Sequence, residues 1–305
     1  MVDIISEKTT ERLEKTGYRF VGKHKHSAVK VCLWTKNSLR GQGVCYKQKF
    51  YGIQSHRCLQ MTPALPFCKH RCKFCWRDIS ITNPEWKGPY DSPEEIIEGS
   101  IEAQRELLSG FKGNEEADKK KWKEAQNPNQ VAISLAGEPT EYPMISELVQ
   151  SFKDRKFSVF LVSNGTNPHV IEKLTEPTNL YITLPAPDYE TYIKTCNPVV
   201  DSWDKIMKSL SFLKNFSCKT VIRLTLVKDL NLIKPELYAK IVDKYEPDFL
   251  EVKSFMSVGF SRTRLPYTAM PLHEEIQEFA QKIQDNSSYK IKDESRPSRI
   301  VLLSK

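Results

Sequence analysis

Three closely spaced cysteines form the strongest chemical signal in this sequence. Cys68, Cys72 and Cys75 lie in the segment FCKHRCKFCW at spacing C-x3-C-x2-C. A structural zinc site needs four ligands in a tetrahedron, and His70 would supply the fourth only from an uncomfortably close position in the sequence. A [4Fe–4S] cluster held by three thiolates leaves one iron open to a small molecule. The sequence favours this second chemistry.

Three further cysteines stand upstream at a regular spacing. Cys32-x12-Cys45-x12-Cys58 fits neither zinc knuckles nor ferredoxin runs, yet it again offers three thiolates. Chance placement of buried cysteines is the alternative, but beside the downstream group a second three-ligand cluster is the better interpretation. Cys196 and Cys218 suggest no site, and we expect both to be small buried apolar residues.

The elements that must position these thiols follow a repeating pattern after residue 80. Short apolar strands alternate with amphipathic helices, which is typical of βα units around a parallel sheet. Six such units predict an α/β fold with a partial, TIM-like (β/α)6 barrel and an N-terminal cluster-binding extension. We expect strands near 57–62, 131–136, 158–163, 180–184, 220–227 and 248–253, and helices near 93–109, 143–153, 168–175, 188–195, 202–216, 235–245 and 271–284.

Local signals refine this pattern at a few positions. The first barrel helix has Ser92 as its cap, Pro93 at its first position and Glu95 closing a capping box. Residues 111–130 are charged and predict an exposed excursion, whereas residues 299–304 predict a closing edge strand. We divide the chain into a basic extension, residues 1–56, and a barrel, residues 57–305.

The cysteine segment resembles the signature of the radical S-adenosylmethionine (SAM) enzymes, because an aromatic residue, Phe74, precedes the last cysteine. In that superfamily the open iron binds the methionyl amine and carboxylate of SAM, and one electron from the cluster releases a 5′-deoxyadenosyl radical. The resemblance extends to AGEP, where Gly137 and Glu138 would hold the SAM amino group. It implies that Ser163 and Asn164, at the end of a strand, reach the cofactor, although a plain turn is the alternative.

A narrower resemblance covers nearly the whole chain. The segments WTKNSLRGQGVCYKQKFYGIQSHRCLQMTPALPFCKHRCKFCWRD, YITLPAPDYETYIKTCNPVVDSWDKI and LEVKSFMSVGFSRTRL closely resemble the archaeal 4-demethylwyosine synthase family. This implies two [4Fe–4S] clusters and SAM as cofactors. It implies two substrates, tRNA(Phe) carrying N1-methylguanosine-37 and pyruvate, which donates two carbons to close a third ring. Eukaryotic relatives carry an extra flavodoxin-like domain, so we expect an external low-potential electron donor, ferredoxin- or flavodoxin-like.

The resemblance also implies a mechanism. The deoxyadenosyl radical takes hydrogen from the guanine methyl group, and the carbon radical attacks pyruvate and expels its carboxyl carbon. The upstream cysteines would hold the cluster that presents pyruvate. Lys47, two residues after Cys45, is the candidate for a Schiff base with pyruvate or for binding its carboxylate. A solvated surface lysine is the alternative.

Recognition of tRNA would depend on positive charge. The chain has a net charge of +8, but residues 1–80 carry 16 Lys/Arg against 5 Asp/Glu, and the remainder is net negative. Such a basic quarter suits a polyanion, although a solvated lysine-rich surface is the alternative. Arg262 and Arg264 are candidate phosphate contacts or ordinary loop charges, and His24 and His26 are expected to be solvated or to face RNA.

A base that reacts must leave its stack. Tyr46, Phe50 and Trp76 are candidate stacking partners, and core packing is the alternative for each.

Composition excludes several classes of protein. No apolar run approaches the roughly 18 residues of a membrane span, and the opening MVDIISEKTTERLEK is charged where a signal peptide is apolar. We therefore expect a cytoplasmic monomer with no membrane partner, in which thiols stay reduced.

Two other functions stay open at this point. One is a radical SAM enzyme for another substrate class, a peptide or another RNA; peptide-modifying enzymes usually place auxiliary cysteines after the barrel, whereas here they precede it. The other is a non-enzymatic Fe–S or zinc RNA-binding module, which would need neither AGEP nor βα repeats.

Overall fold

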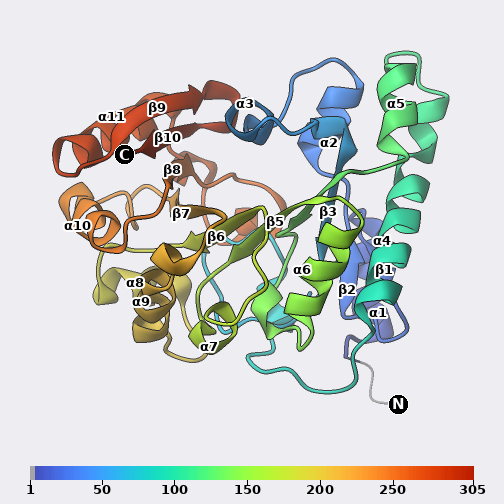
Figure 1. Ribbon diagram of the computed structural model, residues 1–305, viewed down its shortest axis with the longest axis horizontal. Helices are drawn as coiled ribbons and strands as arrows, with labels where there is room; N and C mark the ends of the chain where they lie inside the picture. The colour runs from blue at the N-terminus through green and yellow to red at the C-terminus, as the bar shows by residue number, and fades with distance from the viewer. Residues whose placement is uncertain (1–3) are drawn as a thin grey trace. The chain divides into compact units, whose positions relative to one another are not determined.

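The computed structural model describes residues 4–305 and resolves them into two compact units (Figure 1). The first unit contains all three upstream cysteines, and the second contains Cys68, Cys72 and Cys75. The first comprises residues 4–67, 85–162 and 174–178, and the second comprises residues 68–84, 163–173 and 179–305.

The first unit is built on three parallel strands. β3 (Cys58–Thr62), β4 (Gln130–Ile133) and β5 (Ser158–Ser163) pair in sequence order, as predicted. Their short apolar runs are buried because parallel strands are covered on both faces. Two strands that the sequence analysis missed extend the sheet in antiparallel fashion: β2 (Ser27–Val29) pairs with β3, and β1 (Arg19–Val21) pairs with β2.

Helices surround this sheet, and the best marked of them is α4 (Pro93–Leu108). Its capping box between Ser92 and Glu95 is formed as predicted. Residues 111–130 are not wholly exposed, which corrects the prediction, because Phe111 and Ala125 are buried in a small apolar cluster. The other α-helices of the unit are α1 (Glu7–Lys15), α2 (Leu33–Leu39), α3 (Tyr46–Tyr51), α5 (Lys119–Ala125) and α6 (Ile145–Asp154).

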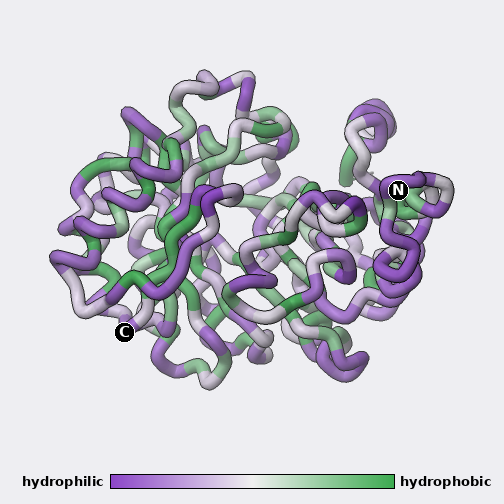
Figure 2. Tube along the Cα trace, turned by 90° about the horizontal axis from the view of Figure 1, so that it is seen from above, coloured by the Kyte–Doolittle hydropathy of each residue, from purple (hydrophilic) through white to green (hydrophobic). Residues whose placement is uncertain are grey.

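The second unit repeats the parallel arrangement and closes with two antiparallel strands. β6 (Asn179–Thr183), β7 (Lys219–Leu226) and β8 (Phe249–Ser254) are parallel, as predicted. β10 (Ile300–Ser304) pairs antiparallel with β8, so the predicted strand is confirmed, but its predicted edge position is wrong because β10 also pairs with β9 (Lys290–Ser295). The missed strand β9 covers β10, and its charged sequence suits an exposed edge. Figure 2 shows this contrast near the C-terminus, where β10 is largely hydrophobic and β9 largely hydrophilic.

Most helices of the second unit agree with the prediction. α7 is shorter than the predicted 168–175, because the Lys173 amide turns back to the Val170 carbonyl and ends the regular helix. None of the helices in residues 4–305 combines the length and apolar character that crossing a bilayer requires. The α-helices are α7 (Pro168–Ile171), α8 (Tyr189–Cys196), α9 (Trp203–Ser211), α10 (Pro235–Tyr245) and α11 (His273–Asp285).

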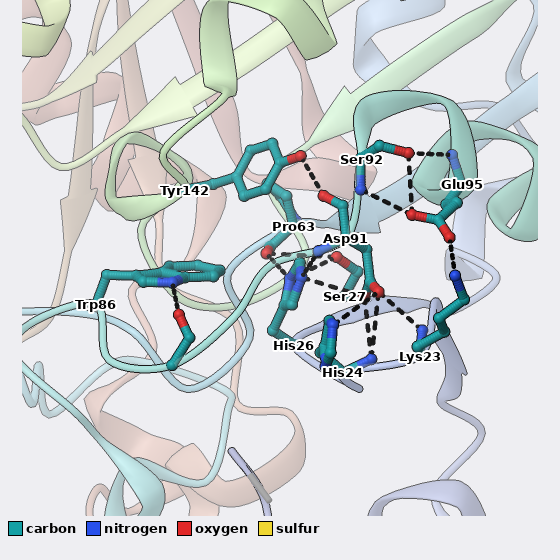
Figure 3. Close-up of polar contacts among 11 residues, drawn as sticks. Lys23, His24, His26, Ser27, Pro63, Trp86, Asp91, Ser92, Glu95 and Tyr142 are labelled. Atoms are coloured by element: carbon teal, nitrogen blue, oxygen red, sulfur yellow. Dashed lines mark hydrogen bonds and ion pairs between the residues drawn. The ribbon is translucent and has the colours of Figure 1, made fainter. Parts of the chain in front are cut away.

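A buried histidine ties the N-terminal part of the first unit to the segment before α4 (Figure 3). His26 Nδ1 lies 2.7 Å from the Pro63 carbonyl oxygen, and its Nε2 lies 2.9 Å from the Asp91 amide nitrogen. Because the carbonyl only accepts and the amide only donates, His26 is neutral with its proton on Nδ1. The Asp91 carboxylate accepts from the backbone N–H groups of Lys23 and His24.

This placement overturns part of the sequence prediction. His26 is fully buried, so the expectation that it is solvated or faces RNA is wrong, whereas His24 is half-buried. Burial lowers the pKa of His26 from 6.5, although its hydrogen bond to Pro63 and the Asp91 charge act in the opposite direction. The basic neighbours in the sequence concealed this residue, because only the fold brings Pro63 and Asp91 to its ring.

The buried neutral state of His26 predicts a pH-dependent stability. The unfolded chain binds a proton near pH 6.5, whereas folded His26 binds it only at lower pH. The contribution of neutral His26 to the free energy of unfolding is therefore complete above pH 6.5. It is lost as the pH drops below that value, by up to about 1.4 kcal/mol per pH unit. Urea unfolding of the cluster-free reduced chain at pH 7.5 and 5.5 measures this. His26→Gln should be less stable at pH 7.5 and show a flatter profile, and an unchanged slope would contradict the assignment. The exposed His169→Gln serves as the control, with unchanged stability at pH 7.5.

Candidate functional site

Backbone pairing fixes the cysteine loop, residues 68–75, in the second unit. The Arg71 amide donates to the Cys196 carbonyl at 3.0 Å, and the Lys73 amide donates to the Thr195 carbonyl at 3.0 Å. The loop therefore lies like a short strand against the end of α8, which the sequence did not reveal. These hydrogen bonds position a loop that contains no helix or strand, and with it the three cysteines.

A buried arginine lies among the three thiols. Arg77 is only 4% exposed, and one arm of its guanidinium, Nη2, donates to the His70 carbonyl at 3.0 Å. Burial alone would lower the pKa of Arg77, but the thiols of Cys68, Cys75 and Cys72 outweigh it and raise that pKa. Three thiols around one guanidinium form a donor set that suits an anionic iron–sulfur cluster, so the residues fit the group that the spacing predicts.

Asn164 stands beside the first of these thiols. Its Nδ2 lies 3.5 Å from Cys68 Sγ, and its Oδ1 accepts from the Thr166 amide at 3.0 Å. Ser163 is buried and accepts from the Gly165 amide at 3.0 Å. The segment after β5 is therefore a turn, as one alternative of the sequence analysis predicted, and it lies beside the cysteine loop.

Phe74 and the loop after β8 pack around the other side of the cysteine loop. Phe74 is half-buried against an apolar cluster of Val227, Phe255, Ala269 and Met270. Arg264 donates from Nε to the Lys73 carbonyl at 3.2 Å and from Nη2 to the Cys75 carbonyl. Arg262 is exposed, and its Nε donates to the Ser257 carbonyl at 2.9 Å.

An open cavity of about 450 Å³ lies beside this loop in the second unit. Its volume falls in the range of small-molecule sites. Two guanidinium groups and one aromatic ring give it a basic, partly apolar wall. The lining residues are Arg71, Asp78, Ile79, Ser80, Phe260, Thr263 and Arg264.

Cys196 lies next to the cysteine loop, although the sequence suggested no site for it. His70, Cys72 and Cys196 each place one ligand atom within 4.8 Å of the others. The Cys196 thiol and burial raise the pKa of Cys72. These donors can hold one metal ion, but only by using a thiol that the predicted cluster needs. The prediction that Cys196 is buried is confirmed, whereas Cys218 is only partly buried, so that expectation was wrong.

The predicted SAM-binding motif after β4 lies in the first unit. Gly137 has φ +68°, and a Cβ there would lie 1.8 Å from the Ala64 carbonyl oxygen, so only glycine fits. Glu138 is buried, its amide donates to the Phe67 carbonyl at 2.7 Å, and its carboxylate accepts from Thr140. These bonds bring the motif against the residue that immediately precedes Cys68 in the chain.

The upstream cysteines come together in the first unit. Cys32 and Cys45 occupy the N-cap positions of α2 and α3, and Cys58 begins β3. Burial, followed by the Cys32 thiol, raises the pKa of Cys58, and the charge of Lys47 acts in the opposite direction. The Cys45 amide donates to Ser55 Oγ at 2.9 Å, which holds that cysteine close to the start of β3. The thiols of Cys32, Cys45 and Cys58, which span 26 positions of the sequence, thus lie near one another.

Lys47 is part of this group. It is buried, with its Nζ 4.5 Å from the centre of the Phe160 ring, so the solvated alternative is wrong. Its charge also lowers the pKa of Cys32, which burial raises. Of the candidate stacking residues, Tyr46 is buried, whereas Phe50 and Trp76 are half-buried.

Two family profiles match the chain. The one described as Radical SAM superfamily matches residues 62–241, more than half of the chain, and the one described as Wyosine base formation matches residues 244–305. The fold and the cysteine loop therefore define a radical SAM enzyme. The tRNA 4-demethylwyosine synthase of Pyrococcus abyssi is 47% identical over 97% of this chain and 88% of its own length. The chain belongs to the family of S-adenosyl-L-methionine-dependent tRNA 4-demethylwyosine synthases.

Other relatives agree in sequence and in structure. The enzyme of Methanocaldococcus jannaschii is 39% identical over 98% of this chain and 96% of its own length. A solved structure of TYW1 with a lysine-pyruvate adduct bound superposes with a TM-score of 0.90 at 37% identity, covering 99% of this chain and 96% of that chain. A crystal structure of archaeal TYW1 gives 0.81 at 34% identity, covering 98% and 96%. These matches confirm the predicted fold class.

The backbone at Gly137 predicts a sharp response to one methyl group. Gly137→Ala should lower the free energy of unfolding by at least about 1 kcal/mol, because the new Cβ meets the Ala64 carbonyl at a positive φ. It should also weaken SAM binding by the cluster-loaded enzyme. Gly110→Ala is the matched control, since a Cβ there has no atom within 4 Å. Urea unfolding and equilibrium dialysis with labelled SAM measure the two effects. Equal unfolding free energies and equal SAM binding in the two variants would contradict the close contact assigned to Gly137.

Proposed function

We propose that this chain condenses pyruvate with N1-methylguanosine-37 of tRNA(Phe) to form the tricyclic 4-demethylwyosine base. The observation that carries the proposal is a pair of thiol groups, one of three cysteines in the first unit beside the buried Lys47 and one of three loop cysteines in the second unit beside the buried Arg77. Membership of the 4-demethylwyosine synthase family supplies the reaction class. Two groups of three thiols suit two clusters that each leave an iron open to a small molecule.

Cys68, Cys72 and Cys75 hold the first [4Fe–4S] cluster in this proposal. When bound, that cluster supplies the electron that cleaves SAM and starts the radical reaction. Gly137 presents backbone and Glu138 a carboxylate to the SAM amino group, whereas Ser163 and Asn164 reach its ribose or carboxylate. Phe74 closes the apolar side of the cofactor site. The short distance from Asn164 to Cys68 Sγ supports this set.

Cys32, Cys45 and Cys58 hold the second cluster, and Lys47 acts on pyruvate beside it. Its amine lies near the thiols and over the Phe160 ring, and a lysine amine can attack the keto carbon of pyruvate. The solved relative whose description includes a lysine-pyruvate adduct supports this role. Attack of the Lys47 amine on the keto carbon with loss of water would give an imine that fixes pyruvate for the radical step.

The remaining partners complete the proposal. The basic N-terminal quarter and the exposed Arg262 contact tRNA phosphates. Arg264 contacts tRNA phosphate only through the guanidinium donors that remain, because its Nε and Nη2 already bind carbonyls of the cysteine loop. An external ferredoxin- or flavodoxin-like protein supplies electrons, and the enzyme acts as a cytoplasmic monomer. Residues 1–56 form the extension that contributes second-cluster ligands, and residues 57–305 form the barrel.

Iron content and radical formation test the function. The anaerobically reconstituted chain should hold about eight irons and release 5′-deoxyadenosine and the tricyclic base from methylated tRNA plus pyruvate. Cys68→Ala should hold about four irons and release no deoxyadenosine, because it loses the SAM cluster. Cys58→Ala should also hold about four irons but keep slow deoxyadenosine release without the tricyclic product. Cys218→Ser is the control. About one zinc per chain with no SAM cleavage would refute the proposal.

Borohydride trapping tests the role of Lys47. Borohydride reduces an imine to a stable amine, so labelled pyruvate should become attached to the chain at Lys47. Lys47→Arg should abolish the labelling and lower product formation at least about 100-fold, the lower range for losing a catalytic group. Lys49→Arg, an exposed lysine of the same helix, should label normally. Mass spectrometry of tryptic peptides locates the label, and a label elsewhere would disprove the assignment.

A further inference from the structure

One nitrogen of Arg77 has no hydrogen-bond partner in the part of the chain that the structure describes. Its side chain is 96% buried, and Nη1 has no hydrogen-bond acceptor among residues 4–305. A buried charged donor left without a partner is costly, and such donors are rare in folded proteins. The vacant donor therefore points to an acceptor that arrives from outside the polypeptide.

The surroundings of the guanidinium indicate what that acceptor is. Nη2 is committed to the His70 carbonyl, which fixes the plane of the group within the cysteine loop. All three loop thiols interact with its charge. The group that binds to these thiols will thus contact the same guanidinium.

We propose that Arg77 Nη1 donates a hydrogen bond to a sulfur of the cluster held by the cysteine loop, and that the buried guanidinium raises the reduction potential of that cluster. This inference rests on the proposed function, because it requires the loop to hold the SAM cluster. Arg77 is a positioning residue, since it acts on SAM only through the cluster.

The physical reason is the charge added on reduction. A cluster bound by three thiolates is already anionic, and one more electron makes it more negative in a poorly solvated place. A fixed positive charge and a hydrogen bond to sulfur both stabilise the reduced form more than the oxidised form. Arginine suits this role because it stays charged when buried and its planar fork reaches two acceptors.

Arg264 provides a contrast in the same loop. It uses Nε and Nη2 on the Lys73 and Cys75 carbonyls, and it is partly exposed. It holds the backbone of the loop, whereas one buried nitrogen of Arg77 has no hydrogen-bond acceptor among residues 4–305. The sequence analysis missed Arg77, and its only signal was a basic residue two positions after the last cysteine.

Redox titration tests the proposal on a chain that carries only the loop cluster, with Cys32, Cys45 and Cys58 changed to alanine. Electron paramagnetic resonance measures the reduced cluster at set potentials. Arg77→Gln should lower the ratio of reduced to oxidised cluster about tenfold at a fixed potential, equal to about 59 mV for one electron. Arg77→Lys should restore part of this loss. Arg71→Gln, an exposed arginine of the same loop, should change the ratio less than threefold.

The outcomes are distinct. A normal iron content with an unchanged ratio in Arg77→Gln overturns the inference and leaves the proposed function intact. Absence of any cluster signal in the parent chain overturns the assignment of the cluster to the loop, and with it both proposals.

A second measurement decides the matter if Arg77→Gln takes up no cluster. The parent chain is prepared with 15N-arginine. Pulsed electron paramagnetic resonance of the reduced cluster then detects hyperfine coupling between the cluster spin and arginine nitrogen. The coupling should be present in the parent chain and lost in Arg77→Lys. Its absence from the parent, or its persistence in Arg77→Lys, overturns the inference.

Discussion

The burial of cysteine sulfur next to a basic side chain is the constraint that shapes both cysteine groups of this molecule. Each compact unit contains one group of three cysteines and one buried basic residue among them, Arg77 in the second unit and Lys47 in the first. Burial disfavours an isolated charge of either sign, so a thiol that releases its proton to bind iron is stabilised by a neighbouring cation. The two kinds of residue therefore complement each other.

The chain positions these groups by backbone contacts more than by regular elements. The cysteine loop has no helix or strand of its own, and it takes its shape from amide bonds to the end of α8 and from carbonyl bonds to Arg264. In the first unit, two cysteines occupy N-cap positions, the third begins a strand, and Ser55 accepts a hydrogen bond from the Cys45 amide. A helix N-terminus presents free N–H groups, which suits a thiolate at the cap.

The two basic residues differ in the chemistry that their side chains allow. Lysine loses its proton readily in a low dielectric and then becomes a nucleophile, whereas arginine stays charged at any ordinary pH. Lys47 therefore suits covalent work on a keto acid, and Arg77 suits a permanent electrostatic role. Gly137 allows a close approach of two backbone segments. This approach brings the motif after β4 against Phe67, the residue before Cys68.

Patterns within short stretches of the sequence are enough to predict the periodic and contiguous features. The six parallel strands, the capped helix α4 and the C-x3-C-x2-C spacing all follow from residues near one another in the chain, where propensity and spacing act directly. Tertiary structure decided what depends on distant residues: the burial of His26 between Pro63 and Asp91, the approach of Cys196 to Cys72, and the seclusion of Lys47 and Arg77. A basic residue has the same sequence signal whether it is solvated or buried, because its surroundings are supplied by other segments.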